Sequence, residues 1–271
     1  MSRPAPTQVA PGVHRLGDHV VNFYLIEDPD GLVLVDAGTP AHLKQLTNLL
    51  AGLDRSLADV RAVLLTHGHA DHTGLAHALR EAGADLWIHE PDAVILRDGP
   101  RSSMRHAKPE RSMLPYLLRR PSALAVPLRL ARDGAFTAPA VPGARVFYGD
   151  QVLKDVPGAP LAVALPGHTP GSAAYSFTDR GLLFTGDALV TADAFSDRTG
   201  PTIVSRCFTH DSAAALAALD RLDELAAEPA AEQTADRTSE RMSELLLPGH
   251  GEPFAGDVRT ATRQARRFGA H

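Results

Sequence analysis

The segment Thr66–His72 constrains the fold of this chain more than any other part of its sequence. It reads Thr-His-Gly-His-Ala-Asp-His and directly follows the apolar run Val60–Leu65. A short apolar run that ends in a loop predicts a buried strand, and strand ends are where α/β sheets place their binding sites. Imidazole and carboxylate groups are costly to bury in a core but are natural ligands of zinc and other first-row metals. The segment therefore predicts a metal-binding loop at the end of a buried strand.

The order of the side chains in this loop divides its four candidate ligands into two pairs. In a sharp turn, His67 and His69 can point to one side while Asp71 and His72 point to the other. We therefore expect the loop to serve two metal ions rather than one. The simpler reading, a solvated polar loop, does not explain why similar residues recur at three further strand ends.

Those three further candidate ligands also follow apolar runs. His168 follows Leu161–Leu165, Asp187 follows Leu182–Thr185, and His250 follows Leu245–Leu247. A glycine directly precedes each of the three, which lets the backbone turn sharply and approach an ion closely. Each turn alone is weak support, but four strand-end groups of ligands in one chain favour a shared metal site.

The order of the apolar patterns predicts an α/β fold. Strand and helix patterns alternate in the first part of the chain, and short strands return after an inserted segment. The expected strands are Val20–Glu27, Leu32–Val35, Val60–Leu65, Asp85–His89, Arg145–Tyr148, Leu161–Leu165, Ala173–Phe177, Leu182–Thr185 and Leu245–Leu247. The expected helices are Leu43–Leu53, Leu75–Ala82, Asp211–Ala227 and a closing helix that ends near Phe268. Residues 228–241 are polar and alanine-rich, and we expect an exposed connection there.

Residues 97–132 differ from the rest in composition and predict an inserted, arginine-rich helical lid. Eight arginines and Lys108 stand against two acidic residues there, in a chain whose net charge is −5. The helical patterns of this segment are interrupted by Pro109, Pro115, Pro121 and Pro127. Its charge fits contact with an anionic substrate, although most charge runs are solvated surfaces. Its apolar residues can cover an acyl chain or pack the insertion onto the body, and both readings stay open; they are Met104, Met113, Leu114, Tyr116, Leu117 and Leu118.

Composition excludes several classes of protein and partner. No run approaches the roughly 20 apolar residues that a membrane-spanning helix needs, so we expect no membrane partner. The N-terminal residues show no signal-peptide pattern, and the single Cys207 suits a reducing compartment, so we expect a cytoplasmic protein. The negative net charge argues against a nucleic-acid partner, which leaves a small-molecule substrate. The sequence makes no prediction of oligomeric state.

Taken together, these motifs resemble the metallo-β-lactamase fold superfamily, with the motif set of its binuclear, glyoxalase II-like hydrolases. The resemblance runs from the hairpin near Val20 to the turn at His250 and includes Asp36-Ala37-Gly38. It implies one domain over residues 1–271, built as a four-layer αββα sandwich of two mixed β-sheets flanked by helices, with the helical insertion at 97–132. It also implies a binuclear site at one edge of the two sheets.

The resemblance implies a role for each ligand of that site. It assigns His67, His69 and His168 to one metal; Asp71, His72 and His250 to the other; and Asp187 to a bridging position between them. It implies two divalent metal ions, with zinc expected and iron or manganese as open alternatives. Asp36 is expected not to bind metal itself but to fix the orientation of a metal-bound histidine.

The expected activity is hydrolysis by a metal-bridging hydroxide that attacks the carbonyl carbon of an ester, thioester or lactone. Asp71 is expected to orient this nucleophile or to take its proton as a general base. The acidic Asp187 argues against a true β-lactamase, since those enzymes typically lack an acidic bridging residue. Two alternatives stay open: an oxidoreductase similar to persulfide dioxygenases, which hold a single iron, and a phosphodiesterase.

Overall fold

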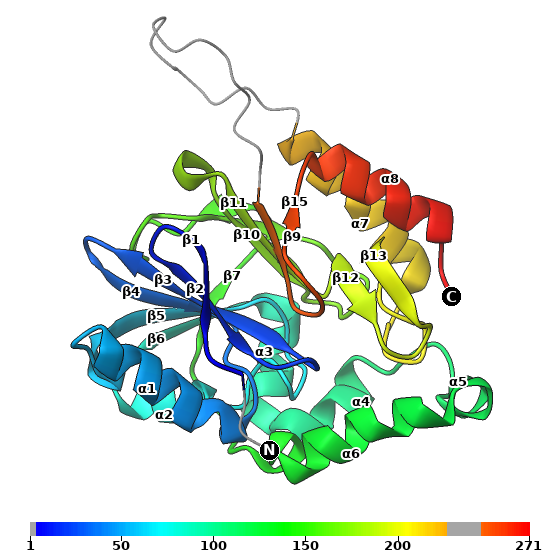
Figure 1. The fold of residues 1–271 in the computed structure, drawn as a ribbon, viewed down its shortest axis with the longest axis horizontal. Coiled ribbons are helices and arrows are strands. Elements are labelled where there is room, and N and C mark those ends of the chain that lie inside the picture. Colours follow the sequence, from blue (N-terminus) through cyan, green and yellow to red (C-terminus); the bar gives the residue numbers. More distant parts are fainter. Residues whose placement is uncertain (1–3, 227–244) are drawn as a thin grey trace, which may run out of the picture.

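The computed structural model describes residues 4–226 and 245–271, which form two large β-sheets, a small one, and helices around them (Figure 1). The first sheet has seven strands in chain order: β1 (Thr7–Ala10), β2 (Val13–Gly17), β3 (Asn22–Asp28), β4 (Gly31–Val35), β5 (Val60–Leu65), β6 (Asp85–His89) and β7 (Arg145–Phe147). The strands from β1 to β4 pair antiparallel, whereas β4, β5, β6 and β7 pair parallel. This sheet is therefore mixed, as expected.

The second sheet is also mixed. Its order is β15 (Phe254–Ala255), β14 (Leu245–Pro248), β11 (Leu182–Gly186), β10 (Ala173–Phe177), β9 (Leu161–Ala164) and β8 (Gln151–Val152). Only β11 and β14 pair parallel. A two-stranded sheet of β12 (Val190–Asp193) and β13 (Arg198–Thr202) stands beside it.

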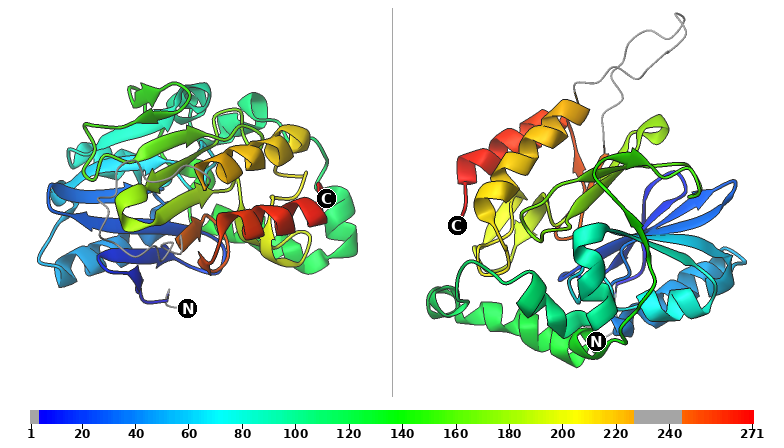
Figure 2. Two further views of the ribbon diagram at one scale, coloured as in Figure 1. Left: turned by 90° about the horizontal axis from the view of Figure 1, so that it is seen from above. Right: turned by 180° about the vertical axis from the view of Figure 1, so that it is seen from behind.

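Three apolar clusters join these sheets and their helices into four layers (Figures 1 and 2). Helices α1 (Leu43–Gly52) and α2 (Ala76–Glu81) pack on the outer face of the first sheet, as does the end of α3 (Glu90–Asp98). Helices α7 (Ser212–Leu225) and α8 (Val258–Phe268) pack on the outer face of the second sheet. Between the sheets lie large side chains such as Tyr24, Trp87, Tyr175 and Phe184. The predicted αββα sandwich is confirmed.

The inserted segment is helical but is broken into short pieces. They are the end of α3, a 3₁₀ turn at Pro100–Ser102, α4 (Ser103–His106), α5 (Leu114–Arg119), a 3₁₀ turn at Pro121–Leu124, and α6 (Ala125–Arg132). Pro115 and Pro127 lie in the first turns of α5 and α6, where a missing N–H breaks no helical bond. In Figure 1 these helices run along the lower edge of the molecule.

Some apolar residues of the insertion pack onto the body, and others are exposed. Met113, Tyr116 and Leu117 pack onto the body against Phe195, Cys207 and Phe208. The side chains of Met104, Leu114 and Leu118 are instead exposed. Cys207 is a buried free thiol.

Some boundaries differ from the expected ones. Strand β3 begins at Asn22 rather than Val20, because Asp18 closes a turn with the backbone of Val20 and Val21. Tyr148 lies outside β7, and Asp211 is the N-cap of α7 rather than its first residue. The connection expected at 228–241 falls outside the described residues. Within 4–226 and 245–271, no helix has the length and apolar character needed to cross a bilayer.

Candidate metal centre

The loop after β5 is shaped by hydrogen bonds to its neighbours at the same sheet edge. Asp36, which follows β4 with a φ of 60°, accepts a bond from the Thr66 backbone N–H at 2.8 Å. The His72 N–H donates to the His69 carbonyl, and the His72 carbonyl accepts from the Ala37 N–H. These bonds fold the loop back on itself, so that its four candidate ligands face the gap between the sheets.

The second sheet brings the other three candidate ligands to the same gap. His168 follows β9, Asp187 follows β11 and His250 follows β14. Because β11 and β14 are parallel with Gly186 opposite Pro248, Asp187 and His250 leave the sheet side by side. The structure therefore brings all seven predicted ligands together.

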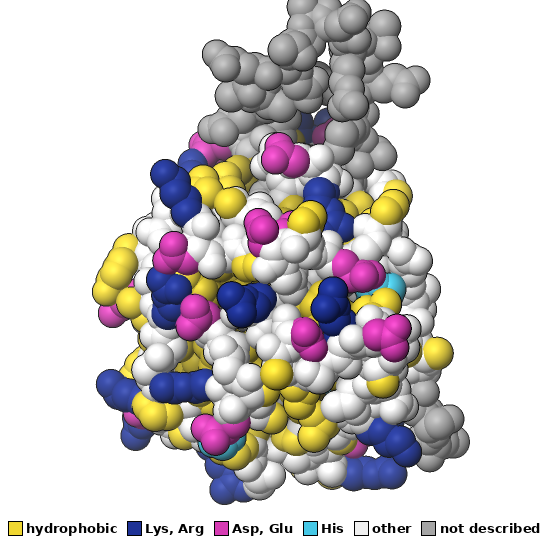
Figure 3. Space-filling model, turned by 90° about the vertical axis from the view of Figure 1, so that its left-hand side faces the viewer, with side chains coloured by type: hydrophobic (Ala, Val, Ile, Leu, Met, Phe, Trp, Pro, Cys, Tyr) yellow, Lys and Arg dark blue, Asp and Glu magenta, His cyan; other side chains and the backbone are white. Residues whose placement is uncertain are grey.

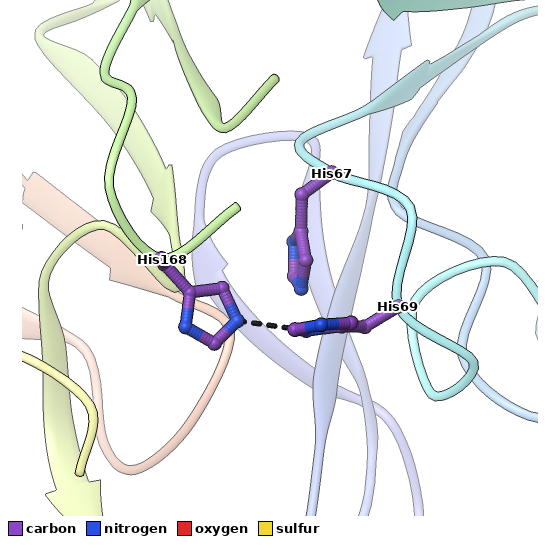
Figure 4. Close-up of side chains that lie close together, drawn as sticks. All are labelled: His67, His69 and His168. Carbon is purple, nitrogen blue, oxygen red and sulfur yellow. Dashed lines mark hydrogen bonds between the residues drawn. The ribbon is translucent and has the colours of Figure 1, made fainter. Parts of the chain in front are cut away.

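One set of donors consists of His67, His69 and His168, called here the first donor set. Their ligand atoms lie within 4.8 Å of one another. The three rings converge on one point from two loops (Figure 4), and His69 Nδ1 lies 2.8 Å from His168 Nε2.

The second donor set consists of Asp71, His72 and His250, which also lie within 4.8 Å of one another. Asp71 Oδ2 lies 3.6 Å from His72 Nε2 and 3.7 Å from His250 Nε2. Asp71 and His250 are only partly buried, as is His69, so both donor sets are open to solvent on one side.

Asp187 stands between the two donor sets. Its Oδ2 lies 3.4 Å from His168 Nε2 and 2.9 Å from His250 Nε2, while its Oδ1 lies 3.5 Å from His72 Nε2. One carboxylate thus faces both sets, which is the geometry that a bridging ligand requires.

Unpaired polar atoms in this cluster fit bound metal ions. Among the described residues, the buried atoms His67 Nε2, His72 Nε2 and Asp187 Oδ1 have no hydrogen-bond partner, although buried polar groups rarely lack one. Gly249 leaves room beside them, because a Cβ there would lie 2.2 Å from Asp187 Oδ1 and 2.7 Å from His72 Cε1. The donor types and the unpaired atoms fit two divalent cations.

Burial and charge set different protonation states in the two donor sets. Burial lowers the pKa of His67, His69 and His168, which favours the neutral imidazole that binds metals. Burial also lowers the pKa of His72, but Asp187, Asp71 and Asp36 outweigh it and raise that pKa to about 10. His250 behaves similarly beside Asp187, with a pKa of about 9.

The bridging carboxylate is ionised in this environment. Burial raises the pKa of Asp187, but the charges of His250 and His72 outweigh burial and hold it well below its usual range.

Asp36 lies behind the second donor set. Its Oδ2 accepts from His72 Nδ1 at 2.8 Å, and both of its oxygens also contact the Thr66 hydroxyl. Because Nδ1–H donates to a carboxylate, the other ring nitrogen of His72, Nε2, is turned toward Asp71 and Asp187. The histidine that Asp36 contacts is thus His72.

Sequence reasoning missed Asp92, a fully buried residue of α3. Its carboxylate accepts bonds from the loops that carry both parts of the first donor set. Nothing near Asp92 in the sequence signals this role, because its partners lie 24 to 79 residues away.

A cavity of about 640 Å³ lies beside the residues that directly follow His250. Its lining includes Arg15, Asn22, Thr191 and Gly251. None of the seven predicted ligands lines it, so we do not assign it as the place of reaction.

Comparison with known proteins identifies relatives of this chain and agrees with its fold. YobT, an uncharacterised protein of Bacillus subtilis, is 29% identical over 62% of this chain and 61% of its own length. YflN of the same organism, named as a probable metallo-hydrolase, is 25% identical over 92% of this chain and 87% of its own length. The alignment with YobT thus spans less than two thirds of that relative.

A solved structure shows the same fold. The metallo-β-lactamase family protein TTHA1429 of Thermus thermophilus superposes with a TM-score of 0.64 at 24% identity, over 95% of this chain and 79% of that one. The sequence profile of the metallo-β-lactamase superfamily matches residues 16–232. With the sandwich and the clustered donors already described, this match shows that the chain belongs to the metallo-β-lactamase superfamily.

Proposed function

We propose that this chain is a binuclear metallo-hydrolase that cleaves an ester, thioester or lactone. The observation that carries this proposal is the position of Asp187 between two complete sets of donors. The match to YflN, named as a probable metallo-hydrolase, supports the same class of activity. We propose zinc as the metal, although imidazole and carboxylate donors also accept iron and manganese.

Each donor set would hold one ion, with Asp187 shared between them. Two divalent ions bound there would supply a hydroxide nucleophile near neutral pH and polarise the substrate carbonyl oxygen. Asp71, which is partly exposed beside the second donor set, would orient the nucleophile and accept its proton. Asp36 would keep His72 in the tautomer that presents Nε2 to the ion.

The insertion would act as a lid because it is fastened on both sides of the site. Glu110 accepts bonds from Arg206 and from the Ser212 hydroxyl, next to the loop of His168. Arg129 donates to Asp18 in the turn between β2 and β3. The segment from α4 to α6 therefore spans the edge at which both donor sets lie, and we propose that it selects the substrate.

We propose a small molecule as the substrate and retain the cytoplasm as the expected compartment. On the face drawn in Figure 3, arginines and lysines alternate with acidic side chains, without a block of one sign. Nucleic-acid binding proteins instead gather basic residues on one face. The face in Figure 3 carries no such basic patch, and the net charge of −5 also favours a small-molecule substrate.

Elemental analysis tests the metal assignment most directly. Wild-type protein purified without added metal is expected to carry about two ions per chain, and His69→Ala about one. His77→Ala, a helix α2 substitution outside both donor sets, is the matched control and is expected to keep both ions. A panel of esters, thioesters, lactones and phosphodiesters then defines the reaction. About one iron per chain, with oxygen uptake on a persulfide, would overturn the proposal in favour of the dioxygenase alternative.

A further inference from the structure

We propose that Asp92 is a positioning residue that sets the distance between the two halves of the first donor set. The inference rests on the proposed function, since it assigns a role toward the metal that His67, His69 and His168 would hold. Asp92 itself is not a ligand, because all three of its hydrogen bonds go to loop groups.

The contacts of Asp92 join two loops that lie far apart in the sequence. Its Oδ2 accepts from the Gly68 N–H and from the Thr169 hydroxyl, each at 2.7 Å. Its Oδ1 accepts from the Gly171 N–H at 2.7 Å. Gly68 lies between His67 and His69, and Thr169 directly follows His168. One carboxylate therefore binds the loops that carry every member of the first donor set.

The hydrogen bonds around Asp92 have one consistent assignment of donors and acceptors. An ionised carboxylate only accepts, so the Thr169 hydroxyl must donate to it. The Ser172 hydroxyl lies 2.8 Å from that of Thr169 and accepts from the Thr169 N–H at 2.9 Å, so its own hydrogen is free for Thr169 Oγ1. The hydroxyl hydrogens of Thr169 and Ser172 are thus both used, which favours one arrangement of these two side chains.

Close packing prevents either loop from moving independently of α3. A Cβ at Gly171 would lie 2.5 Å from the backbone nitrogen of Asp92. A Cβ at Gly68 would lie 2.9 Å from Cβ of Ile95, one turn further along α3. Both loops therefore rest directly on this helix.

The role of Asp92 is separate from that of Asp36. Asp36 contacts His72 and thus the second donor set, whereas Asp92 contacts only the loop positions of the first. None of the three bonds of Asp92 goes to its own helix, so it does not serve α3 as a cap. Substitution of Asp92 is therefore expected to lower the affinity for one metal ion and to leave the affinity for the other unchanged.

The test compares Asp92→Asn with Asp98→Asn, a control at the exposed end of the same helix. A carboxamide replaces one of the two oxygens with an N–H donor, so at least one of the bonds from Gly68, Thr169 and Gly171 loses its acceptor. Zinc affinities are measured by competition with a chelator. We expect one ion to bind about 10 to 100 times more weakly in Asp92→Asn, with the other unchanged. The weakened ion must be that of the first donor set, so His69→Ala is expected to abolish the effect of Asp92→Asn and His72→Ala to preserve it.

A second measurement uses metal-free protein and does not depend on activity. Hydrogen exchange of the peptide that contains Gly68, of the peptide that contains Gly171, or of both is expected to speed up at least tenfold in Asp92→Asn, according to which N–H loses its acceptor. Exchange of both peptides is expected to stay unchanged in Asp98→Asn. Equal weakening of the binding of both ions, or unchanged exchange of both loops, would overturn the positioning role. If the wild-type chain binds no metal, the proposed function fails, while the exchange experiment still decides whether Asp92 holds the two loops.

Discussion

At the scale of single residues, the candidate site depends on carboxylates and glycines that would bind no metal. Asp36 fixes the tautomer of His72 through a hydrogen bond to Nδ1. A ligand histidine whose second ring nitrogen lacks such a bond binds a metal less tightly. Gly249 leaves space that the side chains of Asp187 and His72 fill. The seven ligands alone therefore do not determine the geometry of the site.

Replacing Asp36 tests the support of the second donor set. Asp36→Asn keeps the shape but leaves one oxygen to serve both Thr66 and His72, so His72 loses its fixed tautomer. We expect the ion of the second donor set to bind about 10 to 100 times more weakly. Chelator competition measures this, and the exposed turn variant Asp30→Asn is the control. Unaltered affinity for both ions would show that Asp36 is only a turn residue.

Adding one methyl group tests the space beside Asp187. The new Cβ of Gly249→Ala would lie 2.2 Å from Asp187 Oδ1, so that carboxylate must shift. We expect loss of at least one metal ion by elemental analysis. Gly52→Ala, in helix α1 with no atom within 4 Å of the new Cβ, is the control and is expected to stabilise the protein by up to about 1 kcal/mol. Full metal content in Gly249→Ala would contradict the assigned geometry.

At the scale of elements, the apolar patterns of the sequence predicted the bounds of strands that depend on neighbouring residues alone. Strands β5, β6 and β10 have the predicted bounds, since each is a short run of mostly apolar residues between turn signals. The sequence did not predict the hairpin of β12 and β13, because Gly200 and Pro201 are poor strand residues. The clustering of ligands could be predicted because each directly follows a strand. The contacts of Asp92 could not, because they depend on how distant loops pack.

Asp193, at the end of β12, connects several elements. It accepts from the Ser205 N–H at 3.1 Å and from Ser196 Oγ at 2.7 Å, and it pairs with His271 Nε2 at 2.9 Å. The His271 carbonyl in turn accepts from the Tyr116 hydroxyl of α5. Helix α5 and the residues after α8 are thus held to the small sheet.

Acidification of an Asp193→Asn variant tests this connection. Burial raises the pKa of Asp193, but bonds from His271, Ser205 and Ser196 outweigh burial and lower it. A lowered folded pKa stabilises the protein above the unfolded value near 3.8, and the gain is lost as the pH falls through the folded value. At pH 7 we expect Asp193→Asn to lower the free energy of unfolding by about 1 to 3 kcal/mol.

Urea denaturation at pH 7, 5 and 3 measures this difference between wild type and Asp193→Asn. The difference is expected to persist at pH 5 and to narrow at pH 3. Asp197 lies in the turn between β12 and β13 and forms an exposed ion pair with Arg120. Asp197→Asn is expected to lower the free energy of unfolding by less than about 1 kcal/mol. A difference independent of pH would show that the ionised form of Asp193 contributes nothing.

At the scale of the whole molecule, the candidate centre joins the two sheets. The first sheet supplies four donors from the loop after β5, and the second sheet supplies His168, Asp187 and His250. A ligand that binds only the folded state stabilises it by mass action. Metal ions held by donors of both sheets would therefore stabilise the sandwich as a unit.

Removal of metal tests this coupling of the sheets. At free zinc about 100 times its dissociation constant, each bound ion is expected to add about 2.7 kcal/mol to the free energy of unfolding. For a chain of this size, that corresponds to a fall in Tm of about 5 to 10 °C on chelation of one ion. Scanning calorimetry with and without chelator measures the change. The fall is expected to be smaller in His69→Ala and equal to wild type in His77→Ala; an unchanged Tm in wild type would contradict the coupling.

The charges of the metal-free site give the two donor sets different responses to pH. His72 and His250, with pKa values of about 10 and about 9, carry protons at neutral pH that a metal ion must displace. The histidines of the first donor set have lowered pKa values and are already neutral. Affinity for the second ion is therefore expected to rise between pH 6.5 and 8.5 by about tenfold per unit for each proton released. Affinity for the first ion is expected to change little over that range.

Calorimetry in two buffers of different ionisation enthalpy measures the protons released, about two with the second ion and few with the first. Equal proton release at both steps would show that the carboxylates around His72 and His250 do not control their protonation.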